Sequence, residues 1–224
     1  VIGDTGEGDA SQHVLRDVLW RAASQPDVRF VVLSSDVVYP TGAMKHYEAN
    51  FWLPFKGVTV PVYAIPGNHD WYDALEGFAA TFLEPEAARA AMRARVEIDQ
   101  ELSSTTDADI DGLIAQAAAL GRAYGVRVAR QRAPFFQVQT DAFALLAVDT
   151  GVARRLDSRQ WTWLEQALEA ARGKGIMVVL GHPLFAGGTY QAHVDDDDPT
   201  GFAAVHALLR RHRVSVVMAG DTHD

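Results

Sequence analysis

The feature that most constrains the fold of this 224-residue chain is a regular alternation of short apolar runs with amphipathic segments. The apolar runs have the length of strands buried on both faces, and they lie at 30–33, 60–65, 176–180 and 214–218. The amphipathic segments place apolar side chains at helical spacing, and they lie at 11–23, 158–171 and 202–211. The alternation predicts an α/β protein with helices packed on buried strands.

The sequence also predicts a strand end at its N-terminus, a hairpin near its middle and the first residue of the first helix. Val1 and Ile2 read as the end of a strand, and 137–139 with 143–148 read as a hairpin that turns at Thr140 and Asp141. Ser11 is the expected N-cap of the first helix. The apolar face expected for that helix consists of Val14, Leu15, Val18, Leu19 and Ala22.

Residues 84–132 differ from the rest of the chain, because they are rich in alanine and charge. Apolar side chains recur at helical spacing within this segment, at Ile110, Leu113, Ile114, Ala117 and Leu120. Asp107 or Asp109 is the expected cap of that helix. We interpret 84–132 as a helical insertion within a single domain, 1–224. It acts either as a lid or as a helical hairpin that only packs on the core.

Composition narrows the functional classes. The chain has no cysteine, which excludes disulfides, thiolate metal sites and cysteine nucleophiles. The net charge of −9 argues against a nucleic-acid partner, whose phosphates require a basic face. The sequence has no signal-like segment and no membrane segment. It begins at Val1 and stops at Asp224 directly after a strand-like run, so we expect a fragment of a longer protein and draw no localisation from these absences.

A polar cluster follows five of the expected strands. These clusters contain Asp4; Asp36 and Tyr39; Asn68 and His69; His182; and Asp221 and His223. Because sites in open α/β sheets form at the carboxyl ends of strands, we expect these side chains to share one edge. Glycines at 3, 6, 67, 181 and 220 leave room for sharp turns and for a ligand.

Several carboxylates at one edge repel one another, so either their pKa values rise or cations lie among them. The interleaved imidazole, amide and phenol groups are nitrogen and oxygen ligands, which suit iron, manganese, zinc or magnesium. The set is large enough for two ions if one carboxylate bridges them. Each cluster taken singly has an ordinary alternative, since a lone Asp after a strand usually caps a helix or a turn.

The ordered set of clusters resembles the calcineurin-like metallophosphoesterase superfamily and, within it, the purple acid phosphatases. The resemblance is carried by Gly3-Asp4-Thr5-Gly6, Ser35-Asp36-Val37-Val38-Tyr39, Gly67-Asn68-His69-Asp70, Gly181-His182-Pro183 and Gly220-Asp221-Thr222-His223. The segment 147–168 is also similar to the family. The resemblance covers the chain apart from the insertion, and it implies a four-layer α/β/β/α sandwich of two mixed sheets.

The resemblance also implies a ligand set. One ion takes Asp4, Asp36, Tyr39 and His223, and the other takes Asp36, Asn68, His182 and Asp221. Asp36 then bridges two divalent or trivalent ions. His69 faces the substrate as a catalytic residue, and Asp70 holds its imidazole in the useful tautomer.

Three residues depart from the family pattern. Gly6 stands where many relatives outside the purple branch carry a histidine, and Tyr39 takes the place of that ligand. A tyrosine ligand favours ferric iron, whereas manganese or zinc is expected if Tyr39 is only a core aromatic with a bonded hydroxyl. Asp221 replaces a histidine and adds negative charge, and Ser35 replaces a glycine beside Asp36.

The function implied is hydrolysis of a phosphate mono- or diester by hydroxide bound to the metal pair. A small phosphorylated substrate is expected, and its candidate contacts are Tyr72, His46, Tyr190 and His193. The alternative is a metallophosphoesterase-like domain that binds metal or a partner with little or no turnover. Nucleotide binding through residues 3–8 is a weaker alternative, because their glycine spacing fits neither nucleotide-binding motif.

Overall fold

The structure is a computed structural model that describes residues 1–98, 104–191 and 199–222. Its elements in chain order are α1 (Ala10–Ala23), β1 (Val31–Leu33), α2 (Met44–Tyr47), the π-helix η1 (Glu48–Trp52), α3 (Leu53–Phe55), β2 (Val62–Ala64), α4 (Asn68–Tyr72), α5 (Glu76–Phe82), α6 (Pro85–Ile98), α7 (Asp107–Tyr124), β3 (Phe136–Gln139), β4 (Phe143–Val148), α8 (Ser158–Ala170), β5 (Gly175–Leu180), β6 (Phe185–Ala186), β7 (Thr189–Tyr190), α9 (Phe202–Arg211) and β8 (Val216–Ala219). The expected helices and strands are present within a few residues of their predicted bounds, except that the strand end expected at Val1 and Ile2 is only an isolated bridge.

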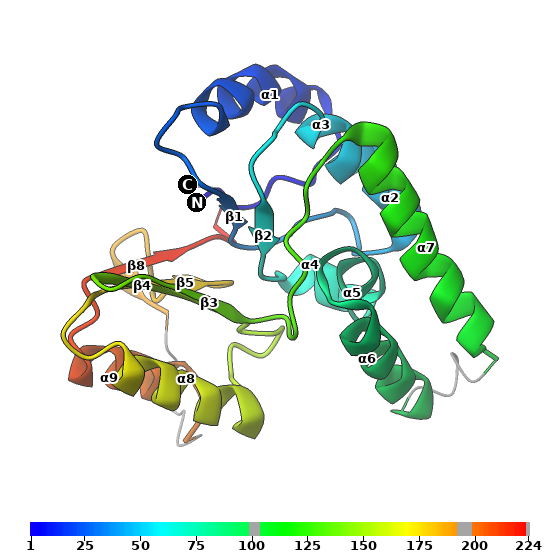
Figure 1. Cartoon of the computed structure of the whole chain (residues 1–224). Helices are drawn as coiled ribbons and strands as arrows, with labels where there is room; N and C mark the ends of the chain where they lie inside the picture. Colours follow the sequence, from blue (N-terminus) through cyan, green and yellow to red (C-terminus); the bar gives the residue numbers. More distant parts are fainter. Residues whose placement is uncertain (99–103, 192–198, 223–224) are drawn as a thin grey trace.

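Two sheets form the centre of the fold (Figure 1). β1 and β2 are a parallel pair with Val31 opposite Val62, and Ile2 adds an isolated parallel bridge to Leu33. The larger sheet has the order β3-β4-β5-β8, in which β3 is antiparallel and the other strands are parallel. The hairpin expected at Thr140 and Asp141 is therefore confirmed as β3–β4.

Alternating side chains of the strands separate the layers, because successive residues of a strand point to opposite faces. In β4, Leu145 and Ala147 lie in an apolar layer between the two sheets, whereas Leu146 lies in the core under α8 and α9. In β1, Val32 belongs to the layer between the sheets and Leu33 to the core shared with the N-terminal helices. The result is the expected α/β/β/α order of layers.

The first helix differs from its prediction in two respects. Its N-cap is Asp9, whose carboxylate accepts a hydrogen bond from the backbone N–H of Ser11 at 2.8 Å. Its expected apolar face stays largely exposed, with Val14 75%, Leu15 60% and Val18 53% accessible. The helix stands off from the first sheet, and a cavity of about 550 Å³ lies beside it.

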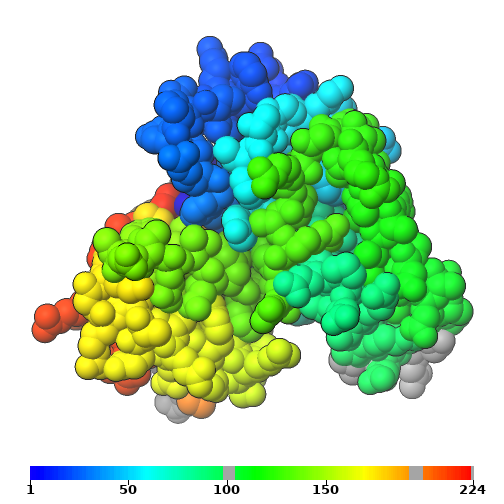
Figure 2. Space-filling model, viewed as in Figure 1, coloured from blue at the N-terminus to red at the C-terminus, as the bar shows by residue number. Residues whose placement is uncertain are grey.

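The segment 84–132 contains the two antiparallel helices α6 and α7 (Figure 1). Thr106 is the N-cap of α7 and Asp109 completes a capping box, so the cap is Thr106 itself. Ile110 and Ile114 of α7 join the core formed with η1 and α5. This packing agrees with the helical-hairpin interpretation, and the status of the segment as an insertion stays a prediction. Figure 2 shows a notch between this helix pair and α8.

None of the helices in the part of the chain that the structure describes is both long and apolar enough to cross a membrane.

Candidate metal centre

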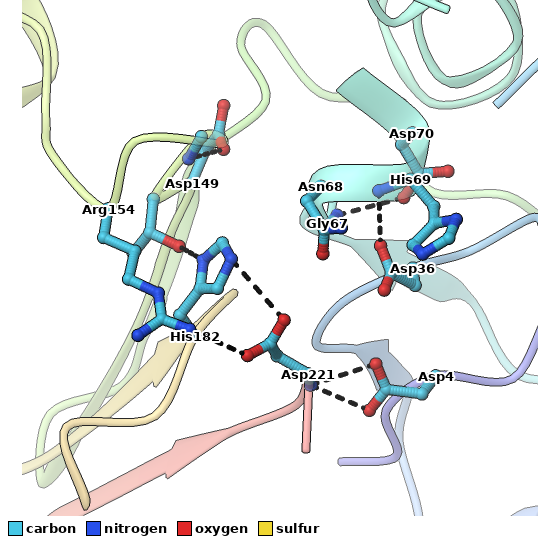
Figure 3. Close-up of polar contacts among 12 residues, drawn as sticks. Asp4, Asp36, Gly67, Asn68, His69, Asp70, Asp149, Arg154, His182 and Asp221 are labelled. Carbon is cyan, nitrogen blue, oxygen red and sulfur yellow. Dashed lines mark hydrogen bonds and ion pairs between the residues drawn. The ribbon is translucent and has the colours of Figure 1, made fainter. Parts of the chain in front are cut away.

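The strand ends of both sheets converge on one region, where the polar side chains face one another (Figure 3). Asp36 follows β1 and Asn68 begins α4 directly after β2. His182 follows β5 and Asp221 follows β8. Asp4 joins them from the segment that follows the Ile2 bridge. His223 lies outside the described residues, so its expected role as a ligand stays a prediction.

Hydrogen bonds connect segments that are far apart in the sequence. Both carboxylate oxygens of Asp4 lie 3.0 Å from the backbone N–H of Asp221, which donates to them. Oδ1 of Asp36 accepts from the backbone N–H of His69 at 2.8 Å. Nε2 of His182 lies 3.6 Å from Oδ1 of Asp221. The acidic and imidazole groups thus form one continuous polar region.

Backbone strain concentrates at this region. Among the described residues, seven non-glycine residues have positive φ, namely Asp4, Asp36, Ala74, Leu75, Arg154, Arg213 and Asp221. Asp4 has φ 53°, Asp36 has φ 31° and Asp221 has φ 85°, so three expected ligands adopt a conformation that L-residues rarely occupy. Such strain persists only where the surrounding structure imposes it, and it clusters at functional sites.

Close packing explains why glycines flank these carboxylates. A Cβ atom on Gly67 would collide with the carboxylate of Asp36, and one on Gly220 would lie 2.8 Å from Oδ2 of Asp4. A Cβ on Gly6 would collide with the backbone carbonyl of Val37. The fold therefore leaves no space for a side chain at Gly6, such as the histidine of the family pattern considered above.

Asn68 presents an oxygen that has no hydrogen-bond partner among the residues that the structure describes. Its Nδ2 donates to the hydroxyl of Tyr72 at 2.8 Å, which fixes the orientation of the amide. Its Oδ1 is buried and accepts no hydrogen bond. A buried acceptor without a donor is costly, and a bound cation would satisfy it.

His69 is oriented by a backbone carbonyl. Its Nδ1 lies 2.8 Å from the oxygen of Pro40, and because a carbonyl only accepts, Nδ1 carries the proton. The ring packs at 4.4 Å from the ring of Tyr39 and at 4.9 Å from that of Tyr72, measured between centroids. Nε2 is the ring nitrogen left for chemistry.

The expected contact between Asp70 and His69 is wrong. Asp70 is fully buried, and its Oδ2 accepts from the backbone N–H groups of Val37 at 2.9 Å and Gly67 at 3.0 Å. Burial raises the pKa of Asp70 to about 7. The carboxyl group joins the turn after β1 to the turn after β2, and Pro40 takes the role that the sequence assigned to Asp70.

Tyr39 is a buried aromatic whose hydroxyl donates to Oδ2 of Asp36 at 3.0 Å. Burial and the charge of Asp36 raise the pKa of Tyr39 above its usual range. Burial likewise raises the pKa of Asp36. A bound cation would favour the charged forms of both groups and so oppose these shifts. A ligand role for Tyr39 stays a prediction.

The loop after β4 supplies residues that the sequence analysis missed. Oγ1 of Thr150 lies 2.6 Å from Nδ1 of His182, and burial lowers the pKa of that imidazole. Asp149 accepts from Nε1 of Trp71 in α4 at 3.1 Å. Arg154 lies 3.3 Å from Asp221. Asp149 and Thr150 directly follow the strand 143–148, so the rule of polar residues at strand ends would have found them.

The donor set fits metal ions by its chemistry. Carboxylate, amide and imidazole groups suit hard and borderline cations, and the buried Oδ1 of Asn68, which has no partner among the described residues, could bind one. Within residues 1–98, 104–191 and 199–222, no three histidine or acidic side chains form a ready-made metal site. The ligand set as a whole therefore stays a prediction.

Of the four residues expected to contact the substrate, one lies at the candidate metal centre. Tyr72 lies at the site, where it contacts both Asn68 and His69. Tyr190 instead bonds through its hydroxyl to Nδ1 of His206 at 2.9 Å. His46 is in α2, and His193 lies outside the described residues.

An α/β sandwich with acidic, amide and imidazole groups at converging strand ends is the architecture of a metallophosphoesterase. The family model for calcineurin-like phosphoesterases matches residues 1–224, and the chain belongs to that family. The family resemblance seen in the sequence is therefore confirmed. A comparison with curated proteins finds no significant match.

Several solved structures are similar in fold. GAP50, described as the anchor in the inner membrane complex of Plasmodium, has 13% identity and a TM-score of 0.60, covering 98% of this chain and 64% of that one. A purple acid phosphatase from yellow lupin (Lupinus luteus) seeds has 15% identity and a TM-score of 0.54, covering 100% and 37%. A dimetal phosphatase from Danio rerio has 16% identity and a TM-score of 0.51, covering 96% and 73%. The chain thus spans less than two thirds of the first two proteins.

Proposed function

We propose that this protein hydrolyses a small phosphate ester with the help of two bound metal ions. The observation that carries the proposal is the convergence of Asp4, Asp36, Asn68, His182 and Asp221 at one edge of the fold (Figure 3). Membership of the calcineurin-like phosphoesterase family supports it. The fold likeness to a purple acid phosphatase and to a dimetal phosphatase is consistent with it.

The proposed ligands are these five residues together with Tyr39 and His223. Bound metal ions would activate water and stabilise negative charge on the phosphoryl oxygens. Hydrogen bonds within the protein orient two of the proposed ligands before a metal ion binds. The amide of Asn68 is held by Tyr72, and the imidazole of His182 is held by Thr150. Such partners orient ligands and raise metal affinity.

His69 is proposed to act on the leaving group. The carbonyl of Pro40 keeps the proton on Nδ1, so that Nε2 can hold a second proton for the leaving oxygen or bind a phosphoryl oxygen. The neighbouring rings of Tyr39 and Tyr72 limit how the imidazole can rotate.

The test is reconstitution of metal-free protein with manganese, iron, zinc or magnesium. Turnover of p-nitrophenyl phosphate and of bis(p-nitrophenyl) phosphate is measured together with metal content. We expect metal-dependent turnover that is lost in Asp36→Asn. A visible absorption band with ferric iron, absent in Tyr39→Phe, would support tyrosine ligation. Full metal occupancy without turnover of either ester would contradict the proposal.

One observation favours a second candidate, a metal-binding or interaction domain without turnover. The structure with a TM-score of 0.60 is described as an anchor, not as an enzyme. Asp221, which replaces a histidine of the family pattern, also already has a cationic partner in Arg154. The same experiment separates the two candidates, because the second predicts metal binding with no hydrolysis.

A further inference from the structure

Arg154 lies at the candidate metal centre although no motif pointed to it. Its Nη2 lies 3.3 Å from Oδ2 of Asp221, and Figure 3 shows the guanidinium beside His182. The Arg154 side chain is 31% exposed and that of Asp221 is 18% exposed. The guanidinium is therefore partly shielded from water and still reachable by a ligand.

The loop that carries Arg154 is held at several points. Oδ1 of Asp149 accepts from the backbone N–H of Gly151 at 2.8 Å as well as from Trp71. The backbone N–H of Arg155 donates to the carbonyl of Thr150 at 3.1 Å. Arg154 itself has φ 54°, a strained value that the surrounding contacts maintain. The loop therefore presents the guanidinium from a fixed position.

The charges around Arg154 indicate what it would bind. Figure 3 shows Asp4, Asp36 and Asp221 together at the candidate metal centre, where the proposed function places the phosphoryl group, and carboxylates repel phosphate. A guanidinium has five N–H donors in a planar arrangement that matches two oxygens of a phosphate. The contact with Asp221 uses one of its terminal nitrogens, which leaves other donors for a ligand.

We propose that Arg154 binds the phosphoryl group of the substrate and that Asp221 holds the guanidinium in place before the substrate arrives. This role rests on the proposed phosphoesterase function and deepens it. Arg154 favours phosphate monoesters over diesters, because a monoester carries two negative charges at neutral pH and a diester carries one. The contact is stronger with the more highly charged group.

The test uses inorganic phosphate as the probe and titration calorimetry of the manganese-loaded protein as the readout. Arg154→Gln removes the charge, Arg154→Lys keeps it without the planar pair of donors, and Arg159→Gln is the control. Arg159 is an exposed residue in the first turn of α8 and carries the same charge as Arg154. The manganese content of each loaded variant shows whether the metal centre still binds metal. The melting temperature of each metal-free variant shows whether the fold remains stable.

We expect Arg154→Gln to weaken phosphate binding by about tenfold or more, as the loss of a charge-assisted hydrogen-bonded pair predicts. Arg154→Lys should give an intermediate affinity, and Arg159→Gln should match the wild type. In turnover assays, Arg154→Gln should raise KM for p-nitrophenyl phosphate more than for the bis ester. Metal content should not change.

Three results would overturn the proposal. The first is unchanged phosphate affinity in Arg154→Gln, and the second is no phosphate binding by the wild type. The third is a parallel loss of metal and phosphate, which would mean that Arg154 only neutralises Asp221. Failure of the proposed function looks different, because phosphate would still bind through Arg154 while neither ester was hydrolysed.

Discussion

Replacement of Asp70 by alanine tests whether this carboxyl group is a structural clamp. Its Oδ2 accepts from the backbone N–H groups of Val37 and Gly67, and the residue is fully buried. Alanine leaves both donors buried without an acceptor, at about 1–3 kcal/mol each, so the expected loss is about 2–6 kcal/mol of unfolding free energy. That is a large part of the ~5–15 kcal/mol that stabilises a typical domain.

Asp70→Asn is the matched control, because the amide retains an oxygen that can accept from both N–H groups. It also removes a charge that burial disfavours, so we expect a loss of about 1 kcal/mol or less. Urea unfolding of the metal-free proteins, followed by circular dichroism, measures both differences. Equal losses in the two variants, or a negligible loss in Asp70→Ala, would refute the clamp.

Asp70→Ala and Asp70→Asn also distinguish a structural role of Asp70 from a catalytic one. The imidazole of His69 contacts the carbonyl of Pro40 and not Asp70. We therefore expect Asp70→Asn to keep most of the turnover of the wild type. A large fall in the turnover of Asp70→Asn, with its stability unchanged, would indicate that Asp70 has a catalytic role.

Three further predictions concern neighbouring residues. Gly67→Ala should lose about 1–3 kcal/mol and bind less metal, because its Cβ collides with Asp36; unchanged metal content would contradict this. His69→Ala should lower turnover about 10²–10⁴-fold with metal content preserved, and a parallel loss of metal would make His69 a ligand. Burial raises the pKa of Asp149 from 3.8 to about 7, so the folded state holds that proton more tightly than the unfolded chain does. The unfolding free energy should then fall as pH rises from about 4 to about 7, and Asp149→Asn should flatten this slope in thermal melts; an identical slope would contradict it.

Much of the site was predictable because one rule governs it. Parallel strands bring their carboxyl ends to one edge, so polar residues after each strand meet there. The rule placed Asp36, Asn68 and His182 correctly in one region. Applied to the strand at 143–148, it would also have found Asp149 and Thr150. It could not find Arg154, which lies six residues beyond the end of β4 and whose contact with Asp221 only the tertiary structure shows.

The errors have a common cause. Adjacency in sequence suggests that Asp70 holds the imidazole of His69. In the structure, the turn after β2 directs the carboxyl group of Asp70 inward and the imidazole of His69 toward Pro40. The apolar face of α1 was expected to be buried because its periodicity is helical. Periodicity predicts the helix and the face, but the distance between α1 and the sheet decides how much of that face is covered.

Periodicity and local residue types predict the α/β alternation, the order of the elements and the residue types at the strand ends. Which polar groups face the candidate metal centre and which stabilise the fold depends on the arrangement of the chain in space. Asp36 and Asp70 are both carboxylates that follow strands. Asp36 faces the candidate metal centre, whereas Asp70 accepts hydrogen bonds from buried backbone N–H groups. That difference depends on the direction of a side chain in space, which no local pattern specifies.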